Sequence, residues 1–588
     1  MHCCGNFDKI ESLWDSIQQE MGVNAMYGYT HMFRRAAAVF IPFGFVLGFS
    51  IPMGMSLDQY DTVARESTNL IGYCLFALFF SLLFTAVMTF LCAKRESICQ
   101  KCSFPLKIPF AGAHKSRFFV LWALFFLCCI PAFLAYYPGI FAYDVSTQIR
   151  LLAEGQISAD HPMLHTLIVA SFLVFGNLIS SYTLGLALFS ICQMLIFSFA
   201  FARAVDFLFR LRLDVGAILL MLYYALSPVN AMFSVNAVKD APYAILFLLV
   251  MVSVAELFFF TKTFIQSKRK MILLACLIAF TALMKATGEA VMLGLCVLLI
   301  VYMKKADVRK KMLRLFAMAL VVFFCMNLAF HAVFDILPRT ETEKLSVPLQ
   351  QVFRVVNHQY DELSDEDIHT LTKLIPEAYW TNYSPRLSDD IKNYLYPGAY
   401  AEHKAEFWRL WRSLGKKCPA EYTDAFFSLN LGFWYPGLQY PDARTYHAYI
   451  ETSIKAPDTP EEAPTVPDGS PVSPDVIGRF YIKRTVKWQS AYTFYESFGD
   501  GKTVLNRLPF SILFTPSGGF YALWILLSMA IYSKKYKILC LCVPALIIWI
   551  MNMFSSIALL RYAYPMLLTM PFIFALFFYR EPPVKAQR

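Results

Sequence analysis

Long apolar runs recur along most of the chain, and each is about as long as a helix that crosses a membrane. A bilayer core needs roughly 20 mostly apolar residues per helix. The segments that fit this pattern are 36–55, 70–93, 118–137, 164–179, 183–203, 215–229, 243–261, 271–286, 288–303, 315–334, 518–533, 537–555 and 562–579. The pattern predicts an all-α polytopic membrane protein.

The basic residues between these segments predict which of them cross. Short loops rich in Lys and Arg face the cytoplasm. If 164–179 crossed the membrane, four basic loops would face outside: 203–212, 262–270, 304–314 and 534–537. Placing 164–179 in the outer interface returns all four to the cytoplasm. We therefore predict about 12 transmembrane helices plus one external interfacial helix, with both termini cytoplasmic.

This topology divides the chain into six parts. They are a cytoplasmic N-terminal segment (1–35), a two-helix membrane addition (36–117), a membrane core (118–334) with a first external loop at 138–182, a large external loop domain (335–517), C-terminal transmembrane helices (518–579) and a cytoplasmic tail (580–588). Within the external domain, the prolines and acids of 456–475 predict a disordered stretch.

Composition supports the membrane assignment. The apolar fraction is 57%, the charged fraction is 16% and the mean hydropathy is +0.49, whereas soluble domains carry about 25% charged residues. This excludes a soluble enzyme, a disordered chain and a coiled coil. Because the net charge of +10 is modest and most of the basic excess lies in the cytoplasmic loops, we expect no nucleic-acid partner.

The first external loop places polar groups beside aromatic ones. It includes Tyr143, Asp144 and Gln148, followed by His161 before a proline. A carboxylate near the membrane surface is partly desolvated, which raises its pKa and makes it a better general base. Asp144 could equally be the N-cap of a helix that begins at 145. Asp144 is therefore a candidate base, with helix capping as the alternative.

Three further external positions carry charges close to apolar segments: Lys239-Asp240, Lys285, and Arg561-Tyr562. Charges at the membrane boundary are costly and are functional candidates, and arginine binds phosphate oxygens in a bidentate manner. Helix capping, snorkelling or an ordinary interfacial arginine would also account for them. The sequence contains no P-loop, Gly-x-Ser-x-Gly or His-Glu-x-x-His motif.

Taken together, these residues resemble the GT-C class of membrane glycosyltransferases. That class carries an acid in its first large external loop, a His-Pro-like segment before a juxtamembrane helix, and often a second acid in the next external loop. The stretch Ser346–Arg354 also looks like a poorly characterised bacterial branch of the class. The resemblance covers roughly 118–360 and 507–579, and the chain departs from it by reading Lys-Asp at 239–240 where acidic pairs are usual.

The resemblance implies transfer of a sugar from a polyprenyl-phosphate-linked donor, with inversion, at the external face of a cell membrane. Asp144 would be the base and Asp240 a supporting acid. The candidate substrate-binding residues are Tyr143, Gln148, His161, Lys239, Lys285, Arg561 and Tyr562. A divalent metal is not required, although the two aspartates could hold one. The acceptor would be a glycan, a lipid or a protein. A transporter or flippase and a polymerase of lipid-linked glycans remain alternatives.

Overall fold

The computed structural model describes residues 7–63, 66–102, 114–142, 144–155, 157–339, 341–438, 450–452 and 482–580. The apolar segments predicted from the sequence are almost entirely helical, although 215–229, 243–261 and 271–286 each run across a break into the next helix. The helices of the bundle are α1 (Phe7–Tyr60), α2 (Ser67–Cys102), α3 (His114–Ala135), α6 (Tyr182–Arg210), α7 (Asp214–Leu226), α8 (Pro228–Ser234), α9 (Asp240–Phe259), α10 (Thr261–Gln266), α11 (Lys268–Met284), α12 (Ala286–Tyr302), α13 (Ala306–Val333), α21 (Pro516–Tyr532), α22 (Tyr536–Asn552) and α23 (Leu560–Phe577).

Among the described residues, seven helices are long and apolar enough to cross a membrane, and the bent pair α7–α8 brings this number to eight. The pair bends by 59° where Pro228 begins α8, because proline cannot continue the hydrogen-bond ladder of the preceding helix. Four more apolar helices are shorter than this test requires: Met163–Ile179, α12, α21 and α22. The chain is thus a multi-span helical membrane protein, and the figure of 12 spans stays a prediction.

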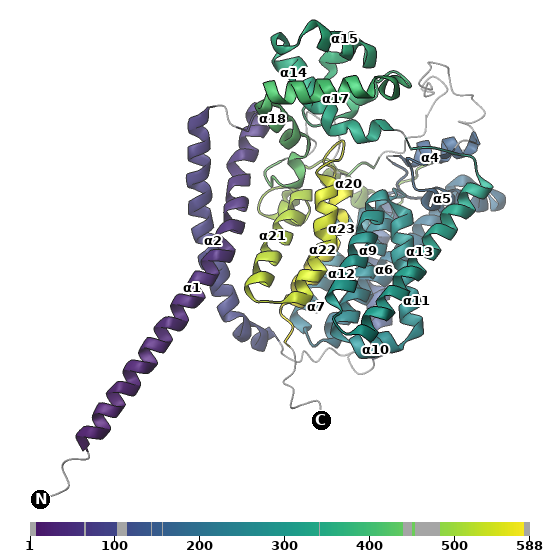
Figure 1. The fold of residues 1–588 in the computed structure, drawn as a ribbon. Helices are drawn as coiled ribbons and strands as arrows, with labels where there is room; N and C mark the ends of the chain where they lie inside the picture. The colour runs from purple at the N-terminus through teal and green to yellow at the C-terminus, as the bar shows by residue number, and fades with distance from the viewer. Residues whose placement is uncertain are drawn as a thin grey trace, which may run out of the picture.

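The centre of the bundle is formed by helices that are apolar on every side, as expected for fully surrounded helices. In α9 and α23 most residues of the membrane-length window are buried, and α9 packs on α6, α11 and α23. The hairpin of α1 and α2 stands beside α21 at one flank (Figure 1). Helix α1 runs without a break across the boundary expected at residue 35.

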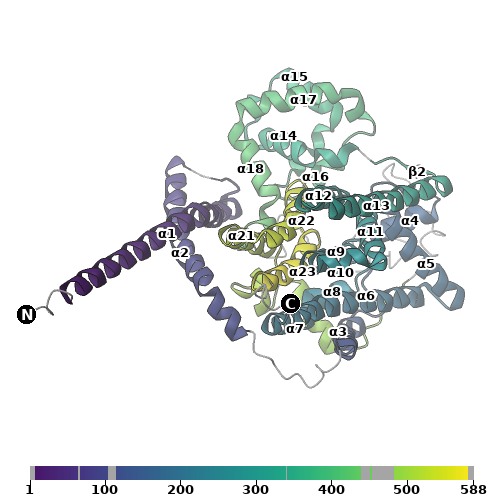
Figure 2. The same ribbon diagram turned by 60° about the horizontal axis from the view of Figure 1, so that its bottom comes forward.

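A helical domain between α13 and α21 sits at one end of the bundle (Figures 1 and 2). Its elements are η1 (Glu341–Leu345), α14 (Ser346–His358), η2 (Tyr360–Glu362), α15 (Asp365–Leu374), η3 (Glu377–Asn382), α16 (Asp389–Lys392), α17 (Ala399–Lys417), α18 (Pro419–Leu429) and η4 (Leu431–Phe433). It has a core of its own, which includes Phe353, Trp380 and Phe407. The proline-rich stretch 456–475 lies outside the described residues.

Residues 482–515 lead from this region back to the bundle. They contain α20 (Gln489–Gly499), which packs on α3, and the short turns η6 (Val504–Asn506) and η7 (Phe510–Leu513). The strands β1 (Ile157–Ser158) and β2 (Ile336–Leu337) pair in parallel, with Ile157 opposite Ile336. The first predicted external loop is therefore joined to the chain that leaves α13.

The helices α4 (Val145–Ala153) and α5 (Met163–Ile179) lie at the same end of the bundle as the α14–α18 domain (Figure 1). They share a small apolar core with the first turns of α6, in which Val145, Leu173 and Leu186 are buried. Gly176 of α5 meets Gly185 of α6 so closely that a Cβ on Gly176 would lie 2.1 Å from the Gly185 nitrogen. This placement is what an external helix requires, and the interfacial assignment of α5 stays a prediction.

The basic loops meet at the other end. The buried carboxylate of Glu256 pairs with Lys270 at 2.8 Å, Arg210 at 3.2 Å and Arg203 at 3.4 Å. Lys535 donates to the backbone oxygens of Phe577, at the end of α23, and of Tyr579, just after it. The loops after α6, α9 and α21 thus gather on one face, as the charge distribution predicts for a cytoplasmic side.

Candidate functional site

The first external loop is held to the bundle by backbone pairing. Ile140 donates its N–H to the Val235 oxygen at 2.8 Å, and the Ala237 N–H donates to the Ile140 oxygen at 2.9 Å. Gly139 allows this approach: its φ is +150°, and a Cβ there would lie 2.2 Å from the Ser190 hydroxyl. Both the backbone angle and the space require glycine. The pairing brings Asp144 beside the segment that carries Lys239.

Five charged side chains from four separate segments meet at this end of the bundle. Asp144 Oδ2 lies 3.0 Å from Lys239 Nζ and 3.3 Å from Arg561 Nη1. Asp240 is fully buried, and its carboxylate contacts Lys285 Nζ at 2.5 Å and Arg561 Nη1 at 3.6 Å. Among the described residues, Arg561 is the cation that contacts both aspartates. Three cations surround two carboxylates, which leaves the cluster with a net positive charge.

The ring of Tyr562 packs against two of these cations. Lys285 Nζ lies 4.4 Å from the centre of its ring, and the Arg561 guanidinium carbon lies 4.9 Å from it. Arg561 Nη2 also donates to the Tyr562 hydroxyl at 3.1 Å. Cations over a tyrosine face are stabilised by the ring quadrupole. The cationic groups therefore have fixed positions before any ligand binds.

His161 joins the cluster from the loop before α5. Its Nδ1 lies 3.3 Å from Lys239 Nζ. Gln148 lies elsewhere: it is buried between α4 and α5, where its amide oxygen contacts His165 at 3.0 Å and Thr166 at 3.3 Å. The structure thus gives Gln148 a packing position rather than one beside the charges. Tyr143 lies outside the described residues.

The pKa of Asp144 departs from the direction that its apolar sequence neighbours suggest. Burial acts to raise its pKa, but Arg561 and Lys239 outweigh burial, and the pKa is held well below its ordinary value. Opposite charges within about 4 Å favour the ionised form. In this arrangement the ionised form of Asp144 is favoured, so the pKa is lowered where the sequence neighbours predict a raised one.

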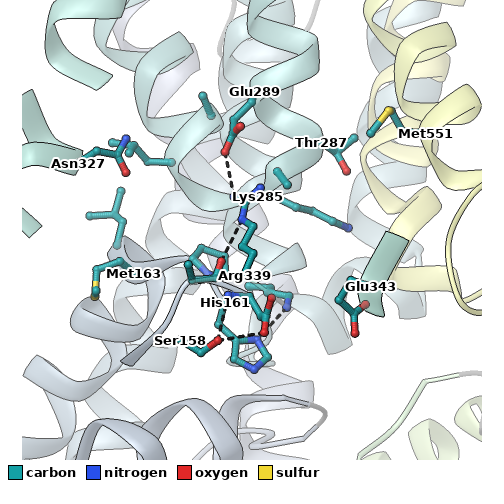
Figure 3. Close-up of a pocket in the computed structure, with 18 of the residues that line it drawn as sticks. Ser158, His161, Met163, Lys285, Thr287, Glu289, Asn327, Arg339, Glu343 and Met551 are labelled. Atoms are coloured by element: carbon teal, nitrogen blue, oxygen red, sulfur yellow. Dashed lines mark hydrogen bonds and ion pairs between the residues drawn. The ribbon is translucent and has the colours of Figure 1, made fainter. Parts of the chain in front are cut away.

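A cavity of about 620 Å³ opens beside the charge cluster. His161, Lys239, Lys285 and Tyr562 contribute to its lining. Figure 3 shows Lys285 and His161 in the middle of the cavity, with Asn327 and Met163 on one side and Thr287, Met551 and Glu343 on the other. The two aspartates are not part of the lining among the described residues. Asp240 is fully buried behind the cations, whereas the side chain of Asp144 is 31% exposed.

The lining combines apolar and polar side chains. We call the apolar side chains of α5, α11 and α13 the apolar flank; they include Leu164, Leu283, Phe323 and Phe330, and the polar Asn327 and His331 lie on the same helix α13. Hydroxyl, amide and charged groups form the rest: Ser158, Asp160, Thr287, Glu289, Asn327, His331, Arg339, Glu343, Lys344, Ser346, Asn552, Ser555 and Ser556. A cavity of this kind suits an amphiphilic ligand with an anionic head.

Sequence reasoning missed several of these lining residues. Asn327 is a polar residue inside the apolar run of α13 and donates its amide to the Phe323 oxygen of its own helix. A lone amide in a span is a recognisable signal, because polar side chains in a span commonly face a cavity or pathway. Arg339, which pairs with Glu289 at 3.1 Å, gives no such signal in the sequence.

The two aspartates do not fit a divalent metal. Among the described residues no three His, Cys, Asp or Glu side chains gather as a metal site. The position between Asp144 and Asp240, where an ion would bridge them, is held by the guanidinium of Arg561. Lys239 and Lys285 contact the carboxylate oxygens that a metal ion would need as ligands. The cluster instead has the composition of an anion site.

The protonation of His161 should be visible in the pH dependence of stability. Burial and the neighbouring Lys239 lower the pKa of His161 to about 4, while Asp144 and Asp160 act in the opposite direction. The unfolded chain takes up this proton near pH 6.5. Stability contributed by neutral His161 is therefore complete above about pH 6.5 and is lost as the pH falls towards 4. In thermal unfolding across this range, His161→Gln is expected to show a smaller loss of melting temperature than the wild type.

The exposed His369 on α15 provides a matched control, because His369→Gln should keep the wild-type slope. Equal slopes for wild type and His161→Gln would contradict the neutral state of His161.

The fold and the site define a class: a multi-span helical membrane protein in which cations, carboxylates and an amphipathic cavity meet at one end of the bundle. Within that class, the chain belongs to a protein family of unknown function, DUF6020, whose match covers residues 152–588. The matched part includes His161, Lys239, Asp240, Lys285 and Arg561, and it begins after Asp144. No curated protein and no solved structure matches the chain.

Proposed function

We propose that this protein is a membrane glycosyltransferase of GT-C-like organisation. It would move a sugar from a polyprenyl-phosphate-linked donor to an acceptor on the external face of the cell membrane, with both termini in the cytoplasm. The observation that carries this proposal is the cavity, which combines a cationic end with an apolar flank. An anionic head and a hydrocarbon tail need both surfaces at once.

The cations are suited to a phosphate leaving group. Lys239 and Lys285 face the cavity, and Arg561 lies directly behind them against both aspartates. Fixed positive groups stabilise the charge that develops on a departing phosphate. The first part of the donor's hydrocarbon chain would lie along the apolar flank, to which Leu164 of α5 and Phe330 of α13 contribute.

Asp144 is proposed as the base. An acceptor hydroxyl oxygen forms a bond to the anomeric carbon while the bond from that carbon to the phosphate oxygen breaks. The phosphate leaves with the bonding electron pair, the hydroxyl proton goes to Asp144, and the configuration inverts. When the donor phosphate binds Lys239 and Arg561, their hold on Asp144 weakens and its pKa rises. The base would thus be most effective only after the donor has bound.

Asp240 has a supporting role in this scheme. Its buried carboxylate pairs with Lys285 and lies 3.6 Å from Arg561, so it orients both cations. Buried carboxylates that bind and orient cations keep a charged site assembled in the absence of ligand. The departure of the sequence from an acidic pair at 239–240 is consistent with a site that binds phosphate through lysine.

Arg561→Ala tests the donor side of the proposal. An arginine hydrogen bond to a charged group contributes about 1.5–3 kcal/mol, so the KM for the lipid donor is expected to rise about tenfold to a hundredfold. The KM for the acceptor should change little. The measurement is transfer from a synthetic polyprenyl-phosphate sugar by the purified full chain in detergent.

Arg412→Ala, on the exposed face of α17, is the matched control and should behave as the wild type. An unchanged donor KM in Arg561→Ala removes this arginine from the donor site. Movement of intact donor across proteoliposomes without any transfer would favour a flippase instead.

A further inference from the structure

The segment that precedes Arg561 has little regular structure of its own, and Arg561 is the second residue of α23, which follows it. Residues 553–559 connect α22 to α23 through turns and extended chain. Asn552 donates its side-chain amide to the Tyr562 oxygen at 3.0 Å, and the Ser555 hydroxyl donates within the turn. These local bonds hold the two ends of the segment. The middle of the segment is held by a contact from another part of the chain.

The outside contact comes from the α14–α18 domain. Leu387 pairs with Ile557 in an antiparallel bridge, and the Ser388 N–H donates to the Ser556 oxygen at 3.0 Å. Leu387, Ile557 and Leu559 form a separate small apolar cluster against Tyr562. We call residues 384–388 the strap. The strap thus contacts residues 553–559, and Tyr562, which follows them, lines the candidate site.

The strap is itself anchored at two points. The buried amide of Gln350 in α14 donates to the Ser384 oxygen at 3.0 Å and to the Leu387 oxygen at 2.9 Å. Arg386 is only 4% exposed and donates to Asp58, at the end of α1, at 2.6 Å. One anchor therefore lies in the α14–α18 domain, and the other lies in the α1–α2 hairpin.

Arg561 must be held closely in place to keep its contacts with both aspartates. It must keep contact with Asp144 at 3.3 Å and with Asp240 at 3.6 Å. The segment before it packs Met553 and Ala558 into the main apolar core and contacts Asn430 and Phe426, at the end of α18, through Met553 and Phe554. A displacement of about 1 Å at a reacting centre can lower a rate about a hundredfold. A segment without its own hydrogen-bond ladder needs an external support to hold such a position.

We propose that Arg386 is a positioning residue for Arg561. Held by Asp58, it fixes the strap, and the strap fixes residues 553–559 and so the start of α23, where the Arg561 guanidinium lies behind the lysines that line the cavity. The α1–α2 hairpin, which lies outside the region shared with the family, thereby takes part in organising the site. The effect of Arg386 on ligand binding rests on the proposed function, in which the site binds a lipid phosphate. The effect of Arg386 on the position of residues 553–559 does not rest on it.

The test uses Arg386→Met in the full chain, since methionine keeps an apolar stem and loses the charge. Farnesyl phosphate is the probe, with its Kd measured in detergent. The expected result is binding weakened by about tenfold, together with faster hydrogen exchange in a peptide covering 553–562. Lys373→Met is the matched control, because Lys373 pairs with Glu406 at 3.2 Å on the same domain away from the strap. It should match the wild type in both measurements.

A disulfide separates positioning from general stability. Leu387→Cys with Ile557→Cys places two cysteines at a bridged antiparallel pair, where the Cα separation suits a disulfide. In the Arg386→Met background, the oxidised cross-link should restore probe binding and slow exchange, and reduction should reverse both. Failure of the confirmed cross-link to restore either property overturns the inference.

Asp58→Asn covers the case in which Arg386→Met does not fold. Asp58 is partly exposed and the change is conservative, so the same two effects are expected in a smaller degree. If the wild type does not bind farnesyl phosphate, the proposed function fails, and the exchange of 553–562 alone decides the positioning role. If the wild type binds the probe, and both Arg386→Met and Asp58→Asn bind it equally well, the positioning inference is wrong.

Discussion

Asp144→Asn is expected to abolish sugar transfer, with a loss of about 10²–10⁴-fold, the usual contribution of a general base. Asparagine keeps the shape of the side chain and cannot accept the proton of the acceptor hydroxyl. It also removes the carboxylate that Lys239 contacts and one of the two carboxylates that Arg561 contacts. Both cations keep their positive charge for the donor phosphate, so donor binding should survive or strengthen. Single-turnover transfer and donor Kd, measured on the same preparation, separate the two effects.

Asp500→Asn is the control for this variant. Asp500 is an acid of the region after the α14–α18 domain and pairs with its near neighbour Lys502 at 2.7 Å. Its replacement should leave transfer at the wild-type rate. Full transfer activity in Asp144→Asn would exclude Asp144 as the base, whatever the state of donor binding.

Arg354→Met is expected to cause the largest loss of stability in the chain. Arg354 on α14 is 2% exposed and contacts Asp61 at 2.7 Å, Glu421 at 2.7 Å and Asp424 at 3.4 Å. Removal of one partner of a buried ion pair costs about 3–5 kcal/mol, because the remaining charges stay buried and unpaired. Three carboxylates from the end of α1 and from α18 would then repel one another.

The expected result is a lower melting temperature, together with easier proteolysis between the α1–α2 hairpin and the α14–α18 domain. Thermal unfolding and limited proteolysis in nanodiscs measure the two. Arg412→Met, on the exposed face of α17, should leave both unchanged. A melting temperature equal to that of the wild type would show that the Arg354 cluster does not hold the hairpin and the domain together.

The helices of the bundle follow closely from the sequence. The predicted apolar segments are almost entirely helical, because a run of about 20 apolar residues can satisfy its backbone in a membrane only as a helix. The ends are less well predicted. Helix α1 extends to Phe7, and the segment 215–229 ends at a bend where Pro228 starts a new helix. Helix ends depend on caps and on neighbouring elements, which hydropathy does not report.

The charged residues of the candidate site could be selected from the sequence because they lie on the predicted external side, where no basic loop accounts for them. Their pairing could not. Asp144 and Arg561 are 417 residues apart in the chain, and contacts at that separation depend on how α3, α9, α11 and α23 pack. The same limit explains the wrong pKa direction for Asp144. Its sequence neighbours are apolar, and its cationic neighbours in space come from other segments.

By itself, the sequence determined that the protein is a helical membrane protein, where its helices lie, and which charges face away from the basic loops. These properties depend on the hydrophobicity of each segment and on the distribution of charge among the loops. Both can be summed residue by residue along the chain. The tertiary structure alone decided that Arg561 lies between two aspartates, that an amphipathic cavity opens beside Lys285, and that a strap at 384–388 holds the segment before α23. Ion pairing and cavity shape depend on distances of a few ångströms between distant segments, and only the packed fold sets those distances.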